Sequence, residues 1–114
     1  MADRWPWPES LEGLVAAPAS HRVLLETPAV RVLEILVEPG AREPEHTHRH
    51  PSVMIVDEPA RLRYYTYGEL AFESSPEQTA SAPPRAEWMP PEEPHSVENI
   101  DVRRYHAFRI EFLA

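Results

Sequence analysis

The sequence has 114 residues, enough for one small domain with a single core but too few for two. It carries 19 acidic and 11 basic residues, giving a formal charge of −8, and every base is an arginine. A nucleic-acid-binding surface needs clustered positive charge, so this balance excludes nucleic acid as a partner. Because cysteine and lysine are both missing, disulfides, thiolate catalysis and Schiff-base chemistry are excluded as well.

The aliphatic runs of the sequence are short. The longest, 35–37 and 53–56, fall far below the length that crosses a bilayer. Residues 1–8 contain no apolar segment of the kind found in secretory signals. We therefore expect a cytoplasmic protein without a membrane partner.

The first 20 residues differ in composition from the rest. They are rich in tryptophan, proline and alanine, and only residues 8–15 could form one or two helical turns. We predict that residues 1–20 form an arm with at most a short helix and that residues 21–114 form the domain. Trp5 and Trp7 have no core of their own and each needs to bury about 150–250 Å². They would do so on the outside of the domain or across a homodimer interface, and we expect a homodimer.

From residue 21 onward, short apolar or alternating runs end in proline, glycine or acidic turns, a pattern typical of strands. The predicted strands are 22–26, 30–38, 45–56, 61–67, 70–73, 85–89, 95–100 and 102–112. Beyond the arm, no window shows helical spacing without an interrupting proline. Pro51 lies inside the third run and should mark a bulge or an edge, because it cannot donate to a ladder. The pattern predicts an all-β sandwich or barrel.

Three histidines alternate at positions 46, 48 and 50. On a strand such side chains share one face, with Cα atoms roughly 6.7 Å apart per step, so neighbouring imidazoles can bind one ion. Zinc, iron, nickel and copper all accept neutral imidazole nitrogen, but two ligands from one strand leave a site incomplete. His95 follows Pro94 at the start of another predicted strand and is the natural further donor.

Two half-motifs resemble those of the cupin superfamily. They are Gly40, His46 and His48 in the first and Pro90, His95 and Asn99 in the second. The resemblance covers roughly residues 22–112. It implies a small cupin jelly-roll barrel of about eight short antiparallel strands. It also implies one divalent transition metal (Zn, Fe, Ni or Mn) held by His46, His48 and His95.

The sequence departs from the family pattern at the fourth ligand. The glutamate that the family places four or five residues after the second histidine falls at Ser52 or Val53, and neither is an acid. Glu92 stands where the second motif has a glycine. We therefore expect a three-histidine site with an open face, as in the cysteine and diketone dioxygenases that this pattern resembles. His50 or Ser52 is the candidate fourth ligand or neighbour of the site.

Other residues are expected around a cavity. Tyr64 shares strand parity with Leu62 and is predicted to point inward, and Met54 and Asn99 are further candidates for the lining. His106 lies on one face with the last strand's apolar side chains, so we place it in the lining too.

Further charged side chains and one histidine are placed outside the site. His21 precedes the first strand and is expected to be exposed. Glu43 and Glu45 are expected to be solvated loop carboxylates rather than acceptors for the ligand histidines. Arg63 could neutralise a substrate carboxylate, although a solubilising strand charge is the commoner role.

The resemblance implies a metal-dependent enzyme, dioxygenase-, isomerase- or lyase-like, acting on a small organic acid or carbonyl compound. The alternative is a non-catalytic cupin that binds or senses a small ligand, with a structural metal or none, and the missing glutamate favours it. A histidine-rich β-sandwich without a cavity is the third interpretation. The sequence does not decide whether the protein is an enzyme.

Overall fold

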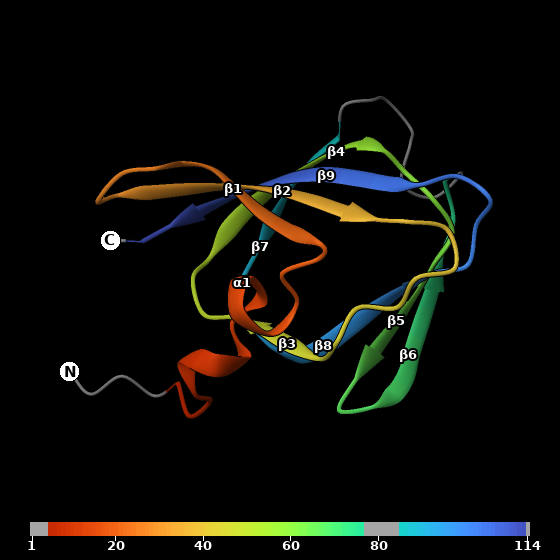
Figure 1. Cartoon of the computed structure of the whole chain (residues 1–114), viewed down its shortest axis with the longest axis horizontal. Coiled ribbons are helices and arrows are strands. Elements are labelled where there is room, and N and C mark those ends of the chain that lie inside the picture. The colour runs from red at the N-terminus through yellow and green to blue at the C-terminus, as the bar shows by residue number, and fades with distance from the viewer. Residues whose placement is uncertain (1–4, 77–84, 114) are drawn as a thin grey trace.

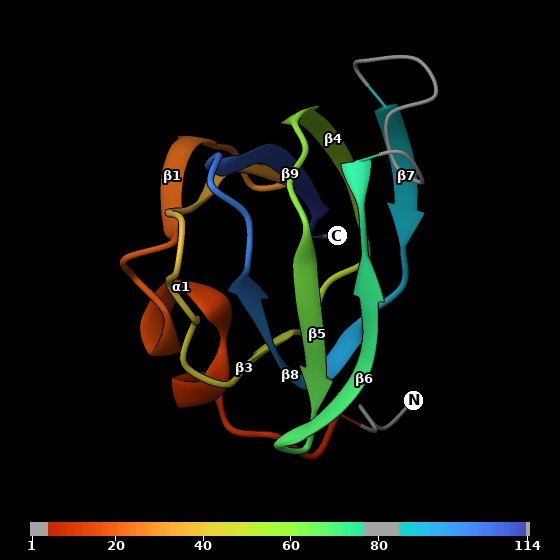
Figure 2. The same ribbon diagram turned by 90° about the vertical axis from the view of Figure 1, so that its right-hand side faces the viewer.

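The computed structural model describes residues 5–76 and 85–113. Two antiparallel sheets face each other across a central core (Figures 1 and 2). The strands are β1 (His21–Glu26), β2 (Val30–Val37), β3 (His46–His48), β4 (Ser52–Glu58), β5 (Leu62–Thr66), β6 (Glu69–Ser74), β7 (Arg85–Met89), β8 (Glu92–Asn99) and β9 (Tyr105–Phe112). The predicted all-β class is confirmed.

The chain passes repeatedly from one sheet to the other. The larger sheet has the order β1-β2-β9-β4-β7 and the smaller one β3-β8-β5-β6. Strands distant in sequence therefore become neighbours, such as β2 with β9 and β3 with β8. The sheets form a barrel whose inside is reached by side chains from both.

The third predicted strand, 45–56, is two strands in the structure. β3 belongs to the smaller sheet and β4 to the larger one, with Pro51 between them. A proline cannot donate to a ladder, so the break at this position follows from its chemistry. The eight predicted runs thus become nine strands.

The eighth strand begins earlier than its sequence pattern indicated. It starts at Glu92 rather than His95. This extension pairs Glu92 with His48 across the β3–β8 ladder. The side chain of Glu92 therefore reaches the region where the histidines lie.

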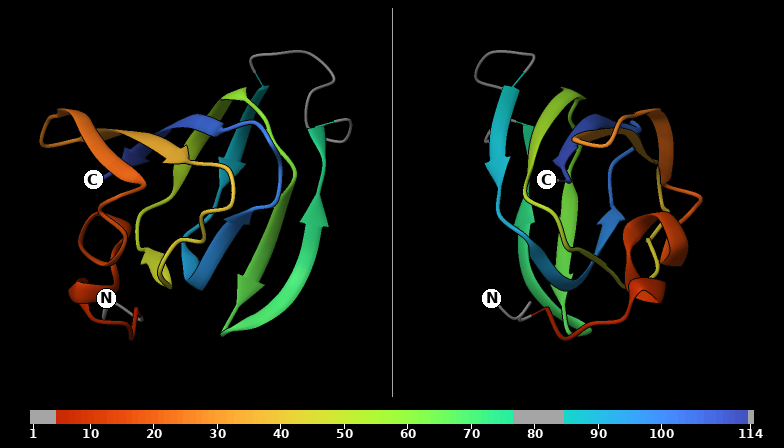
Figure 3. Two further views of the ribbon diagram at one scale, coloured as in Figure 1. Left: turned by 45° about the vertical axis from the view of Figure 1, so that its right-hand side comes forward. Right: turned by 90° about the vertical axis from the view of Figure 1, so that its left-hand side faces the viewer.

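The N-terminal arm contains two short helical segments, η1 (Glu9–Leu11) and α1 (Gly13–Ala16). Between them, Glu12 accepts hydrogen bonds from Thr47 Oγ1 at 3.0 Å and from the backbone N–H of Arg49 at 3.1 Å. These bonds hold the arm against β3, beside the start of β1 (Figure 3). The expected homodimer stays a prediction. Among the described residues, no helix is long and apolar enough to cross a membrane.

The apolar core lies between the sheets and is small. Leu33, Ile35, Met54 and Ala107 form it, all at most 9% exposed. Arg109 and Glu111 continue the inward face of β9 and are 4% and 1% exposed. One part of the barrel interior is therefore apolar and the other is charged.

Candidate metal centre

The β3–β8 ladder brings the two half-motifs together. His46 is directly opposite His95, and their ring centroids are 4.4 Å apart. The His48 ring lies 5.0 Å from that of His46 and 5.3 Å from that of His95. All three histidines are at most 3% exposed. Three imidazoles from two separated segments thus meet inside the barrel.

A fourth histidine joins them from the other sheet. His21, the first residue of β1, has its ring centroid 4.7 Å from that of His46 and 5.2 Å from that of His48. It is 5% exposed, whereas the rest of β1 is exposed. The expectation that His21 is exposed was wrong, because its place beside the arm turns this one side chain of β1 inward.

The ligand atoms form two groups of ion-binding size that share one histidine. His21, His46 and His48 make one group, and His48, Glu92 and His95 make the other, so His46 and His95 fall in different groups. A third group, Asp57, Glu58 and His106, is separate from these two. Within each group the ligand atoms lie within 4.8 Å of one another. His48 is therefore the central residue of the cluster.

Backbone carbonyls set the tautomers of three of these rings. His46 Nδ1 lies 2.9 Å from the carbonyl of Pro44, and His95 Nδ1 lies 2.7 Å from that of Glu93. His21 Nδ1 lies 2.9 Å from the carbonyl of Ala17. A carbonyl oxygen can only accept, so we assign the proton to Nδ1 in each ring. Each Nε2 then presents a lone pair, the arrangement that metal-binding histidines usually have.

The surroundings also keep three rings, those of His21, His48 and His95, neutral by lowering their pKa values. Burial, and then repulsion from His46, lowers the pKa of His21 to about 3. Burial lowers the pKa of His95 to about 4, against an opposing effect of Glu92. The pKa of His48 is lowered well below its usual value by burial and by Arg109. Neutral imidazole is the form that binds a metal, so the environment favours coordination at neutral pH.

Gly13 of the arm lies against the histidines. A Cβ at this position would be 2.8 Å from His21 Nε2 and 2.9 Å from His48 Cε1. Real Cβ atoms essentially never come so close to other atoms. Glycine thus leaves open a space beside two donor rings that any other side chain would fill.

Two buried carboxylates and the partly buried Glu92 flank the cluster. Glu43 Oε1 lies 3.9 Å from His46 Nε2, Glu92 Oε1 3.8 Å from His95 Nε2, and Glu111 Oε2 3.7 Å from His48 Nδ1. Glu43 is 8% exposed and accepts a 2.6 Å hydrogen bond from Ser20 Oγ, so it is not the solvated loop residue expected. Burial raises the pKa of Glu43 and that of Glu111.

Arg109 connects the carboxylate of Glu92 to Ser52, one of the two candidate positions of the missing family ligand. Its Nη2 donates to Glu92 Oε2 at 2.6 Å and its Nη1 donates to Ser52 Oγ at 2.8 Å. Tyr64 Oη donates to Glu92 Oε1 at 2.7 Å. Burial would raise the pKa of Glu92, but Arg109 and His95 outweigh it and lower the pKa. Among the described side chains, Arg109 Nε is buried without a hydrogen-bond partner.

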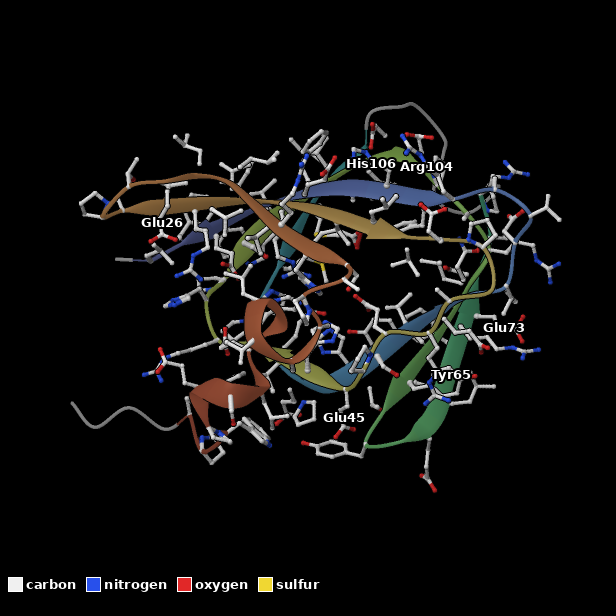
Figure 4. All side chains as sticks on the ribbon, in the orientation of Figure 1. Glu26, Glu45, Tyr65, Glu73, Arg104 and His106 are labelled. Carbon is white, nitrogen blue, oxygen red and sulfur yellow. The ribbon has the colours of Figure 1, made fainter. Side chains whose placement is uncertain are left out.

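A cavity of about 220 Å³ adjoins the cluster. Its polar lining includes the four histidines together with Glu43, Glu87, Glu92 and Arg109, and Met54, Leu62 and Phe72 are among its apolar residues. Tyr64 points into it and stacks on His95, with ring centroids 5.3 Å apart. Its neighbour Tyr65 lies on the other face of β5, where its hydroxyl donates to Glu98 (Figure 4).

A surface groove of about 700 Å³ adjoins the cavity and shares three lining residues with it. Trp5, Trp7 and Tyr67 contribute to it. Tyr64 and Glu92 line both the groove and the cavity, as does His95. The groove therefore adjoins the histidine cluster at these shared side chains.

Two residues that the sequence placed in the cavity lie elsewhere. His106 is on the outer face of β9, where Nδ1 is 2.6 Å from Asp57 Oδ1 and Nε2 is 2.7 Å from Glu34 Oε2 (Figure 4). Asn99 is fully buried, but its Nδ2 donates to the carbonyls of Val37 and Arg103 and so shapes a turn. The cavity lining thus includes Tyr64 and Met54 but neither of these two.

Four further residues considered from the sequence are also separate from the cluster. His50 lies beyond the end of β3, half-buried, and belongs to neither group of ligand atoms. Ser52 is buried, but its hydroxyl accepts from Arg109. Arg63 is 43% exposed and pairs with Glu73 on the outer surface, and Glu45 is exposed (Figure 4).

The donor set fits a divalent transition metal. It offers several neutral imidazole nitrogens with fixed tautomers and no thiolate, a combination suited to zinc, iron, nickel or copper. The space kept open by Gly13 and the second-sphere carboxylates agree with this fit. Sequence reasoning missed His21, Arg109 and Glu111, whereas Glu92 carried a signal as an acid at a motif glycine position.

No family model matches the sequence, and no curated protein matches it. Solved structures do resemble the fold. A cupin domain from Bordetella pertussis Tohama I has a TM-score of 0.69 at 20% identity, covering 82% of this chain and 92% of that one. An RmlC-like cupin family protein with a double-stranded β-helix fold, from Methanocaldococcus jannaschii, has a TM-score of 0.57 at 15% identity, covering 81% and 79%.

A third similar structure is the DMSP lyase DddQ from Ruegeria pomeroyi DSS-3, with a TM-score of 0.56 at 13% identity. The match covers 81% of this chain but only 45% of the lyase. Identities this low show a common fold and nothing about a reaction. The chain has the cupin fold, as its two half-motifs predicted, and it has a histidine cluster compatible with a metal site.

Proposed function

We propose that this cupin-fold protein holds one divalent transition metal through His46, His48 and His95 and acts as an enzyme on a small organic acid or carbonyl compound. One observation carries the proposal. Imidazoles from both half-motifs meet at the wall of a partly open cavity, and in His46 and His95 a backbone carbonyl directs the Nε2 lone pair away from the backbone.

The cavity limits the size of the substrate. Its volume of about 220 Å³ is below the roughly 300–1,000 Å³ of sites for drug-sized ligands. An apolar lining on one side and charged residues on the other suit a molecule with one polar end. A short carboxylic or carbonyl compound has this form.

The side chains around the cluster have separate tasks in this proposal. When bound, the metal would act as a Lewis acid on a substrate oxygen or, as ferrous iron, would support dioxygen chemistry. Arg109 lines the polar end and would offset the charge of a substrate carboxylate. Arg109 and His95 lower the pKa of Glu92, so its carboxylate, held by Tyr64 and Arg109, would supply negative charge beside the ion.

A non-catalytic binding or sensing protein is the second candidate, and one observation favours it. His21 places a fourth imidazole beside His46 and His48, and four ligands can close the coordination sphere of zinc.

One protein of similar fold, a DMSP lyase, supports the enzyme candidate, and it does so by analogy alone.

Elemental analysis of tag-free protein tests the metal site. We expect close to one transition metal per chain, lost in His48→Ala and retained in His50→Ala, since His50 lies outside both ligand groups. Equal metal content in the two variants would overturn the assignment. The loaded protein would then be incubated with small 2-oxo acids and diketones, and products identified by mass spectrometry. Tight binding of such compounds without turnover would favour the second candidate.

A further inference from the structure

We propose that His21 is the fourth ligand of the metal, so that the centre has four imidazoles and the missing motif glutamate is replaced by a residue from β1. This inference rests on the proposed metal site at His46, His48 and His95. It assigns a ligand that lies outside both half-motifs and at the root of the N-terminal arm.

The position of His21 is the first argument. Its ring lies 4.7 Å from that of His46 and 5.2 Å from that of His48, and its ligand atom lies within 4.8 Å of theirs. The side chain comes from the larger sheet, whereas β3 and β8 belong to the smaller one. His21 thus approaches the cluster from the opposite wall of the barrel, and ligands from both walls can surround an ion.

The hydrogen bonding of His21 is the second argument. Its Nδ1 lies 2.9 Å from the Ala17 carbonyl, just as His46 and His95 use the carbonyls of Pro44 and Glu93. In all three rings the proton is assigned to Nδ1 by the same reasoning, so Nε2 has a free lone pair that can bind a metal. This arrangement leaves His21 Nε2 able to bind an ion in the same way as Nε2 of His46 and of His95.

The space at Gly13 is the third argument. A Cβ there would come within 2.9 Å of both His21 and His48. The arm therefore approaches the two rings through its glycine, which leaves the volume next to His21 Nε2 free of side-chain atoms.

The carboxylates near the cluster are weaker candidates for the fourth position. Both oxygens of Glu92 accept strong hydrogen bonds, one from Tyr64 and one from Arg109. Glu43 Oε2 accepts from Ser20, and Glu43 belongs to neither group of ligand atoms. These acids are placed to offset the charge of the ion from the second sphere.

Four neutral nitrogens would restrict the metals that allow catalysis. Zinc prefers four ligands in structural sites, so a fourth histidine would close it to substrate. Iron and nickel accept six ligands and would keep two positions for substrate oxygens. The enzyme function would therefore require an ion that accepts more than four ligands.

Copper(II) is the probe for the test, because electron paramagnetic resonance (EPR) of the bound ion reports how many nitrogens coordinate it. Apo protein, His21→Gln and the matched control His50→Gln would each be titrated with copper(II). We expect a four-nitrogen pattern in wild type and in His50→Gln. In His21→Gln we expect three nitrogens and at least about tenfold weaker binding. Circular dichroism of each apo protein would show that it is folded.

Adding free imidazole to copper-loaded His21→Gly separates coordination from packing. If His21 is a ligand, imidazole entering the vacated space restores the four-nitrogen spectrum. A wild-type spectrum and affinity in His21→Gln, combined with loss of copper in His46→Gln, would overturn the fourth ligand and leave the three-histidine site intact. If wild type takes up no copper, zinc or nickel, the proposed function fails and this inference fails with it.

Discussion

Arg109 Nη2 donates to Glu92 Oε2 at 2.6 Å in the interior of the barrel. The same guanidinium donates Nη1 to Ser52, one of the two positions where the cupin motif would place its glutamate. Glu92 itself occupies the position of a motif glycine. One arginine therefore contacts both departures from the motif. On β4 the expected carboxylate is absent, and on β8 Glu92 supplies a carboxylate where the motif has glycine.

Replacing Arg109 by methionine should destabilise the protein strongly. The change leaves the carboxylate of Glu92, 11% exposed, without its cation in the interior. Breaking a buried ion pair in this way costs about 3–5 kcal/mol. Urea denaturation at neutral pH would measure the loss in the free energy of unfolding.

The double variant Arg109→Met/Glu92→Gln tests whether the loss comes from the unpaired charge. We expect it to be more stable than Arg109→Met alone, because it contains no buried carboxylate at position 92. Additive effects of the two single changes would contradict an interaction between these residues.

Gly13→Ala should weaken metal binding and lower stability. In an ordinary helix this change stabilises by roughly 0.5–1 kcal/mol, so a loss would have the opposite sign from helix propensity. The expected loss comes from the overlap of the new Cβ with His21 and His48. Isothermal titration with nickel(II) would measure the change in affinity.

Gly68→Ala is the matched control, since a Cβ at Gly68 has no neighbour within 4 Å. Gly68 has a φ of +81°, so alanine there strains the turn but does not touch the site. Gly13→Ala with wild-type affinity would show that the arm does not confine the histidines.

The fold could be predicted from the sequence because its signals are local. Short strand runs separated by prolines, and two half-motifs in the right order, need no long-range information. His46, His48 and His95 could also be placed together, because the motif spacing carries a known register. The sequence predicted an irregularity at Pro51, but it did not predict that the chain passes from one sheet to the other there.

The inward face of β9 shows why part of the site could not be predicted. In β9, the apolar residues Phe108 and Ile110 alternate in step with His106. From this alternation we predicted that the face carrying these three residues points into the barrel. In the structure the opposite parity faces inward and carries Arg109 and Glu111. A one-residue change of parity exchanges the two faces of a strand. The charged inner face is stable only because Ser52, Glu92 and Arg31 pair with it, and those partners come from other strands.

His106 should make stability depend on pH. Burial would lower its pKa, but the hydrogen bonds to Glu34 and Asp57 outweigh this and raise it. The folded state therefore binds the His106 proton more tightly than the unfolded state. Its contribution is fully present below the unfolded pKa of about 6.5 and is lost as pH rises through the higher folded pKa. At pH 6, His106→Gln should cost up to about 1 kcal/mol, because the carboxylate partners are partly exposed.

Urea midpoints of wild type and His106→Gln, measured between pH 6 and pH 9 in the presence of chelator, would test this dependence. The difference between the two proteins should shrink as pH rises. A difference that stays constant or grows would show that His106 contributes by packing instead of by charge.

Metal binding should raise the melting temperature. An ion that binds only the folded protein stabilises it by about 2.7 kcal/mol at a free concentration 100 times its Kd. For a chain of this length that corresponds to a rise in Tm of roughly 10 °C.

Chelation should reverse the rise in Tm, and differential scanning calorimetry with and without nickel(II) would measure it. His50→Ala should show the full wild-type shift and His48→Ala should show none, because only His48 is shared by the two groups of ligand atoms. Equal shifts in both variants would place the bound ion outside the barrel.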